Sequence, residues 1–153
     1  LDGGDGGHQR RLLDRMGRPG TLERADAEQL ADEATRLAEA EAVAIHIAVC
    51  DAAGHLILYK KHDDANVISG DIAIAKAFTS AGTGAATGDL TARTLPGEPG
   101  WGLQHMASGC LTTLGGGVAL RHNEQVIGAL GVSGGSVAQD VAIATAAARI
   151  LET

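Results

Sequence analysis

The amino-acid sequence predicts an α/β fold of the α+β type, in which helices pack as a sandwich on a central, mostly antiparallel sheet. Two ranges, 43–61 and 115–135, each contain two apolar runs separated by a short polar turn, the pattern of a β-hairpin. Helical patterns stand before, between and after these hairpins. That order suits helices on an antiparallel sheet better than a doubly wound parallel fold.

Length and composition predict one domain. The 153 residues are 44% hydrophobic, which is sufficient for a core without disulfides or metals. Phe, Tyr and Trp occur once each, so Ala, Val, Ile and Leu must fill that core. Residues 1–20 have no sustained apolar period, so we expect a flexible N-terminal arm followed by a single domain of residues 21–153.

The first element is expected to be a helix over residues 22–42, capped by Thr21. This segment has one apolar stripe and is otherwise strongly acidic, which is typical of a helix that covers a core on one side only. The first hairpin follows, with its turn at Asp51–Gly54. In its first strand, His46 shares a face with small residues. We favour a hydrogen-bonded core histidine there over the floor of a pocket.

The segment DIAIAKAFTSAG, residues 71–82, predicts a buried helix, because apolar residues cover every face at 3.6 residues per turn. Lys76 is the only formal charge between Ile72 and Gly88. A buried ammonium needs a partner or a function. It either closes a core ion pair, with Asp51, Asp71 or a carboxylate of a neighbouring subunit, or it contacts a ligand.

Residues 83–117 are irregular and contain Trp101 and His105. A connection of this length carries function or hides a short helix, for which GDLTARTL (88–95) is the candidate. We expect the second hairpin to turn near His122–Asn123. The last helix should begin with a capping box of Ser136 and Gln139 and continue through residues 141–151.

The loop GVSGGS, residues 131–136, has two interpretations. Glycines directly before a helix leave backbone N–H groups able to accept a carboxylate or phosphate. The same glycines also permit tight packing of a strand against a helix. Without a Walker or Rossmann context, the sequence favours neither interpretation.

Charge and apolar content exclude several partners. The net charge of −7 disfavours nucleic acid and anionic membrane surfaces. No apolar run approaches the length of a spanning helix and the start lacks a signal-peptide core, so we expect a cytoplasmic protein, although a removed leader would leave no trace. Cys50 and Cys110 lack CxxC spacing, which indicates two reduced and mostly buried thiols.

Three stretches together resemble the HbpS and GlcG family, the haem-binding group that includes the C-terminal domain of PduO-type proteins. They are CDAAGHLILYKKHDDA, DIAIAKAFTSAG and GGGVALRHNEQVIGALGVSGGSVAQD, and the resemblance covers residues 21–152. It implies a central antiparallel sheet, assembly into dimers or multiples of dimers, and haem or iron binding in some members. The chain departs from the family where Lys60-Lys61-His62-Asp63-Asp64 follows the second strand, and in its few aromatic residues.

Two function classes remain open. In the first, the domain binds haem or another small ligand: His62 or His105 ligates the metal, and a cation or the loop amides meet the propionates. In the second, a small enzyme acts on a carboxylate- or carbonyl-bearing metabolite, with His62 or His105 as general base beside nearby carboxylates and Lys76 as anchor. The candidate binding residues are His46, Lys76, Trp101, Gly131, Ser133, Gly134 and Gly135.

Overall fold

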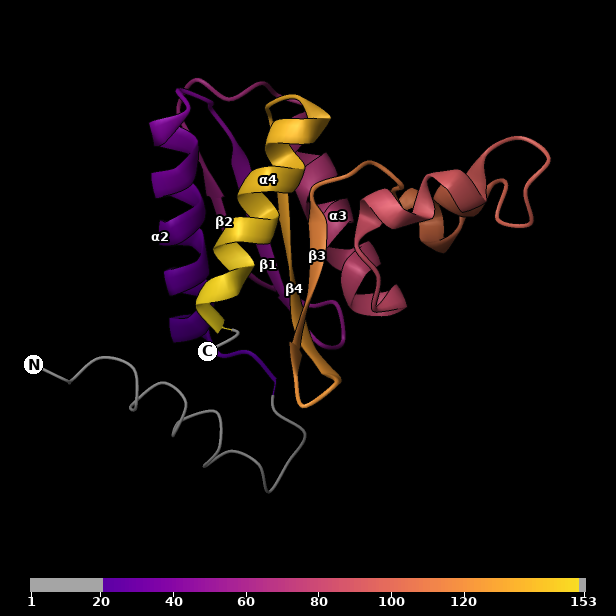
Figure 1. Ribbon diagram of the computed structural model, residues 1–153, viewed down its shortest axis with the longest axis horizontal. Coiled ribbons are helices and arrows are strands. Elements are labelled where there is room, and N and C mark those ends of the chain that lie inside the picture. The colour runs from indigo at the N-terminus through magenta and orange to yellow at the C-terminus, as the bar shows by residue number, and fades with distance from the viewer. Residues whose placement is uncertain (1–20, 152–153) are drawn as a thin grey trace, which may run out of the picture.

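The computed structural model describes residues 21–151, and the predicted arm of residues 1–20 lies outside this range. The elements follow the predicted order of helix, hairpin, helix, irregular segment, hairpin and helix (Figure 1). They are α2 (Arg24–Ala40), β1 (His46–Asp51), β2 (Leu56–Lys61), α3 (Ser69–Thr83), β3 (Gly117–His122), β4 (Gln125–Ser133) and α4 (Val137–Ala148).

The four strands form one antiparallel sheet in the order β2-β1-β4-β3. The two hairpins join through their inner strands, with His46 of β1 opposite Ser133 of β4. The predicted antiparallel sheet is therefore confirmed. Residues from both ends of the domain meet at its centre, which brings the glycine-rich end of β4 beside the start of β1.

Helices cover both faces of the sheet (Figure 1). Helices α2 and α4 pack on one face over large aliphatic side chains such as Ile47 and Leu130. Helix α3 packs on the other face over a second cluster of small residues, Ala48, Cys50 and Ala129. Alternation along β1 sorts these two sets, because successive side chains point to opposite faces. The small set allows the α3 backbone to approach the sheet closely.

Two predicted boundaries differ from the structure, and a third agrees with it. Helix α2 begins after Glu23 rather than Thr21, because Glu23 and Asp26 form a capping box. The second hairpin turns at Asn123 and Glu124, whose φ values of 48° and 69° form the tight turn. Helix α4 begins at Val137, directly after the predicted capping box of Ser136 and Gln139, which is confirmed.

Helix α3 is not buried on every face, contrary to the prediction. Its buried residues include Ala73, Lys76 and Ala77, which face the sheet. Ile74 is exposed, and Asp71 marks the same outer side near the start of the helix. The helix is apolar all round in sequence, yet within residues 21–151 no element covers its outer face completely.

The irregular segment between α3 and β3 consists of short 3₁₀ turns that project from the body of the molecule (Figure 1). The helix predicted over residues 88–95 is present in this tighter form, as η1 (Thr87–Leu90) and η2 (Ala92–Thr94). Two further turns follow, η3 (Leu103–His105) and η4 (Ala107–Gly109), and a fifth, η5 (Arg149–Leu151), ends the described chain. None of the helices in residues 21–151 has the length and apolar character needed to cross a bilayer.

Candidate functional site

Lys76 forms a core ion pair, but not with the predicted partner. Its ammonium donates to Asp140 Oδ2 at 3.1 Å and to the Val132 carbonyl at 2.8 Å. The prediction of Asp51 or Asp71 was wrong, because the partner, Asp140, stands in the first turn of α4, which follows shortly after the end of β4. Burial lowers the pKa of Lys76, and the charge and hydrogen bond of Asp140 partly oppose that shift. Only 1% of Lys76 is exposed.

The backbone of the loop before α4 binds a negatively charged group, and this group is a side-chain carboxylate of the protein itself. The Gly135 N–H donates to Asp140 Oδ1 at 2.9 Å, and the Ser136 N–H donates to Gln139 Oε1 at 2.9 Å. Asp140 therefore bridges the loop amide and the Lys76 ammonium. Two of the N–H groups expected to meet a ligand are satisfied internally.

Close packing explains two glycines of this loop. A Cβ on Gly131 would lie 2.8 Å from the Ala77 nitrogen and closer still to the Ala73 carbonyl, so α3 could not approach β4. Gly134 has a φ of 142° and faces the backbone of Ala44 and Ile45. Ser133 ends β4 and is buried. The tight-packing interpretation accounts for all of these contacts.

His46 is a hydrogen-bonded core histidine, as favoured from the sequence. It is 2% exposed. Its Nε2 lies 2.6 Å from the Asn66 carbonyl, which only accepts, so Nε2 carries a proton. Nδ1 then accepts from the Tyr59 hydroxyl. Both ring nitrogens are engaged with protein partners.

His62 lies between the end of β2 and helix α2, and its backbone N–H donates to the Ile45 carbonyl at 2.9 Å. Its Nδ1 lies 3.2 Å from the Ile45 N–H nitrogen. Its Nε2 is buried without a hydrogen-bond partner, and Glu39 Oε1 lies 3.8 Å away. We expected the neighbouring carboxylate to come from Asp63 or Asp64. Within 4.0 Å and among residues 21–151, it comes instead from Glu39 on α2.

The two predicted site residues of the irregular segment, Trp101 and His105, are exposed. Beside them, the segment and the end of α3 enclose a pocket of about 620 Å³, which we call the Arg93 pocket. Its lining residues come from α3, η1, η2 and the chain leading into η3. They are Thr83, Leu90, Arg93, Thr94, Glu98, Pro99, Gly100 and Leu103.

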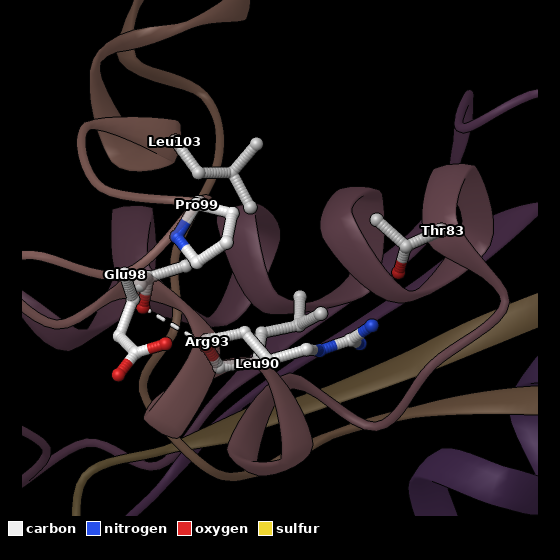
Figure 2. A pocket seen from close by; sticks show the side chains of 8 residues that line it. Thr83, Leu90, Arg93, Glu98, Pro99 and Leu103 are labelled. Carbon is white, nitrogen blue, oxygen red and sulfur yellow. Dashed lines mark hydrogen bonds between the residues drawn. The ribbon is translucent and has the colours of Figure 1, made fainter.

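The Arg93 pocket combines apolar walls with two opposite charges, the guanidinium of Arg93 and the carboxylate of Glu98, and both residues are exposed. Figure 2 shows the Arg93 side chain extending toward Thr83, with Leu90 beside it and with Pro99 and Leu103 on the far side of the pocket. Within the described chain, no carboxylate forms an ion pair with the guanidinium. An unpaired guanidinium among apolar side chains is suited to a ligand carboxylate, which it can bind in bidentate geometry.

One feature of the sequence pointed to Arg93, but the irregular segment around it gave no indication of where it lies in the fold. Arg93 is the only Lys or Arg between Lys76 and Arg121. It stands in a segment without sustained periodicity, so the sequence offered no means of bringing it toward Leu90 and Leu103. The structure also corrects the prediction for the thiols: Cys50 is buried, whereas Cys110 is exposed.

Comparison with known proteins agrees with this fold. Residues 22–149 match the family described as "Haem degrading protein HbpS-like". The chain belongs to the HbpS-like family. Corrinoid adenosyltransferase PduO of Citrobacter freundii is 38% identical over 119 residues, which are 78% of this chain and 36% of that protein. The HbpS-like chain thus spans little more than a third of the length of its PduO relatives.

Two solved structures share the fold of this HbpS-like domain. Klebsiella pneumoniae protein ORFY superposes with a TM-score of 0.86 at 34% identity, covering 89% of this chain and 94% of its own. A PduOC:heme complex superposes with a TM-score of 0.81 at 35% identity, covering 84% of this chain and 94% of its own. The resemblance seen in the sequence is therefore confirmed.

Proposed function

We propose that this domain binds haem in the Arg93 pocket. The observation that carries the proposal is the unpaired Arg93 guanidinium in a largely apolar pocket of about 620 Å³. A haem needs apolar walls for its macrocycle and cations for its propionates, and this pocket offers apolar walls and one such cation, Arg93. The haem complex of PduOC, a protein of the same fold, adds support.

Among the lining residues, the threonine hydroxyls are poor candidates for an iron ligand. Thr83 Oγ1 donates to the Thr79 carbonyl at 2.7 Å, and Thr94 Oγ1 donates to the Leu90 carbonyl at 2.9 Å. His105 ends the turn η3, two residues after the pocket residue Leu103. Of the two predicted ligands, His105 would hold the iron of a bound haem, because His62 lies at the β2 edge of the sheet beside α2. Bound haem would supply redox chemistry at its iron.

An absorbance titration tests this proposal. Haem added to the purified domain should give a Soret band that saturates at one haem per chain. Arg93→Gln should weaken binding about tenfold, because a charge-assisted contact with a propionate is lost. His105→Gln should shift the Soret maximum, because the iron loses a ligand.

Two matched controls make this experiment specific. Arg149→Gln removes an exposed guanidinium on η5, and His55→Gln removes an exposed imidazole in the first hairpin turn. Both should leave the titration unchanged. A Soret band that is insensitive to Arg93→Gln and His105→Gln would refute the assignment of the site.

The alternative is an enzyme acting on a carboxylate-bearing metabolite, and it uses the same unpaired Arg93 guanidinium. In that case His105 would serve as general base. The predicted anchor Lys76 lines neither the Arg93 pocket nor a second pocket beside α3. Binding of a small dicarboxylate that is lost in Arg93→Gln, with no Soret band, would favour this alternative.

A further inference from the structure

A second pocket lies against the outer face of α3, on the side of the helix away from the sheet. It has a volume of about 360 Å³. Three separate parts of the chain form it: the turn of the first hairpin, the outer face of α3, and the end of η4. The lining residues are Gly54, Asp71, Ile74, Ala75, Phe78, Gly109 and Cys110.

Local structure holds the walls of this α3 pocket in place. Gly54 has a φ of 84°, and a Cβ there would lie 2.9 Å from the Phe78 ring, so the only phenylalanine packs directly on the turn. Asp51 Oδ1 accepts from the N–H groups of Ala53 and His55, both at 2.9 Å, which fixes the turn. The pocket is therefore formed before any ligand binds.

The pocket is apolar apart from two groups. Ile74, Ala75 and Phe78 provide most of the wall. Asp71 contributes the one charge, and within residues 21–151 its carboxylate has no ion pair and no side-chain hydrogen bond. Cys110 contributes an exposed thiol. An apolar cavity with few polar groups is the usual form of a small-molecule site.

We propose that the α3 pocket binds a small organic amine, with an apolar body against Phe78 and Ile74 and an ammonium group beside Asp71. Three observations carry this inference. The wall is apolar, the only charged lining residue is an unpaired carboxylate, and the protein has a net charge of −7, which favours the approach of cations. The inference does not depend on haem binding in the Arg93 pocket, which contains the Arg93 cation as well as the Glu98 carboxylate.

The charge of Asp71 also has a structural effect, since the carboxylate lies in the first turn of α3 and interacts favourably with the helix dipole. That effect explains an acidic residue at this position but not the apolar pocket around it. The experiment must therefore separate ligand binding from helix stability.

A titration followed by ¹H–¹⁵N correlation spectra at low ionic strength separates the two. The probes are 2-phenylethylamine and the neutral 2-phenylethanol, which have nearly the same size and differ in charge. Both should shift the amide resonances of Ile74, Ala75 and Phe78. The amine should bind about fivefold more tightly, as expected for one partly exposed charge pair.

Three altered proteins complete the test. Asp71→Asn should reduce the affinity for the amine to that for the alcohol, while Glu41→Gln, an exposed carboxylate at the end of α2, should change neither. Carbamidomethylation of the exposed Cys110 should obstruct both probes without unfolding the protein. Equal affinities of the two probes for the unaltered protein would overturn the amine class. Shifts that leave the α3 residues unaffected would overturn the site.

Discussion

Cys50 and Cys110 lie in opposite environments. Cys50 is buried under α3 and its Sγ lies 3.4 Å from the Ala77 carbonyl, while Cys110 is exposed. Burial raises the pKa of Cys50 to about 11. At pH 8 roughly one Cys50 in a thousand is therefore a thiolate. We expect Ellman's reagent to modify one thiol per native chain and two in urea, and rapid modification of both thiols in the native protein would contradict this assignment.

The raised pKa of Cys50 also predicts how stability depends on pH. The pKa is about 11 in the folded chain and near 9 in the unfolded chain. Between these values the folded state holds more protons than the unfolded state. The contribution of Cys50 to the free energy of unfolding is therefore fully present below pH 9 and is lost as the pH rises toward 11. The loss is at most about 1.4 kcal/mol per pH unit. Urea unfolding measured between pH 9 and pH 11 should show that the stability of Cys50→Ala falls less steeply with pH than that of the wild type.

The pair of Lys76 and Asp140 predicts a large effect from a single substitution. Lys76→Met leaves the buried Asp140 carboxylate with the Gly135 N–H but without its cation. Removing one partner of a buried pair costs about 3–5 kcal/mol, so urea unfolding should show a loss of that size. The double variant Lys76→Met/Asp140→Asn should recover much of it, because the amide oxygen still accepts from Gly135.

Lys60→Met is the matched control for Lys76→Met. Lys60 forms an exposed pair with Asp32 at 3.4 Å, so its loss should cost less than about 1 kcal/mol. If Lys76→Met unfolded like Lys60→Met but failed to bind ligand, the sequence-based interpretation of Lys76 as a ligand contact would be supported instead.

At the scale of elements, the contact between α3 and β4 depends on Gly131. A side chain at this position would meet the Ala73 carbonyl and the Ala77 nitrogen, which are backbone atoms of α3 and cannot move independently. We expect Gly131→Ala to lower the free energy of unfolding by at least about 1–3 kcal/mol through overpacking. Gly82→Ala is the control, because a Cβ there meets nothing within 4 Å and should stabilise α3 slightly. Equal stability of the two variants would contradict this account of Gly131.

The alternation of residues along the strands was sufficient to predict the sheet, but it could not predict which residues of distant elements contact one another. Alternation along β1 separates Ile47 from Ala48, and this pattern depends only on neighbouring residues. The ion pair joins residues 64 positions apart, and only the packed structure determines that α4 presents Asp140 to Lys76. For the same reason, the apolar outer face of α3 could not be distinguished from a buried face.

Glycine and turn-rich segments were the least predictable part of the candidate site. The sequence allowed Gly131 and Gly134 either to bind an anion or to permit close packing, and the two alternatives need the same residue type. In the irregular segment, neither helical nor strand periodicity relates Arg93 to Leu103. Its 3₁₀ turns fold back on one another by contacts that no short pattern describes.

For the whole molecule, we expect a symmetric dimer or a multiple of dimers, as the sequence suggested. The segment that projects from the body in Figure 1 carries several exposed apolar side chains. Leu95 is 50% exposed, Trp101 58% and Met106 60%. Exposed apolar side chains on a projecting segment are typical of a surface that contacts another protein. We expect that protein to be a second copy of this chain, because most soluble oligomers are assembled from identical chains.

Trp101 provides both the reporter and the variant for this prediction, since it is the only tryptophan. Light scattering at micromolar concentration should give at least twice the mass of one chain, and Trp101 emission should shift to the blue as the concentration rises and the indole becomes buried. Trp101→Ser should weaken association about tenfold or more, because a central aromatic side chain often dominates an interface. Val67→Ser, which alters a 96% exposed residue in the loop before α3, should have no such effect. A monomer at these concentrations would exclude self-association, and dissociation by Val67→Ser alone would place the interface at the start of α3 instead.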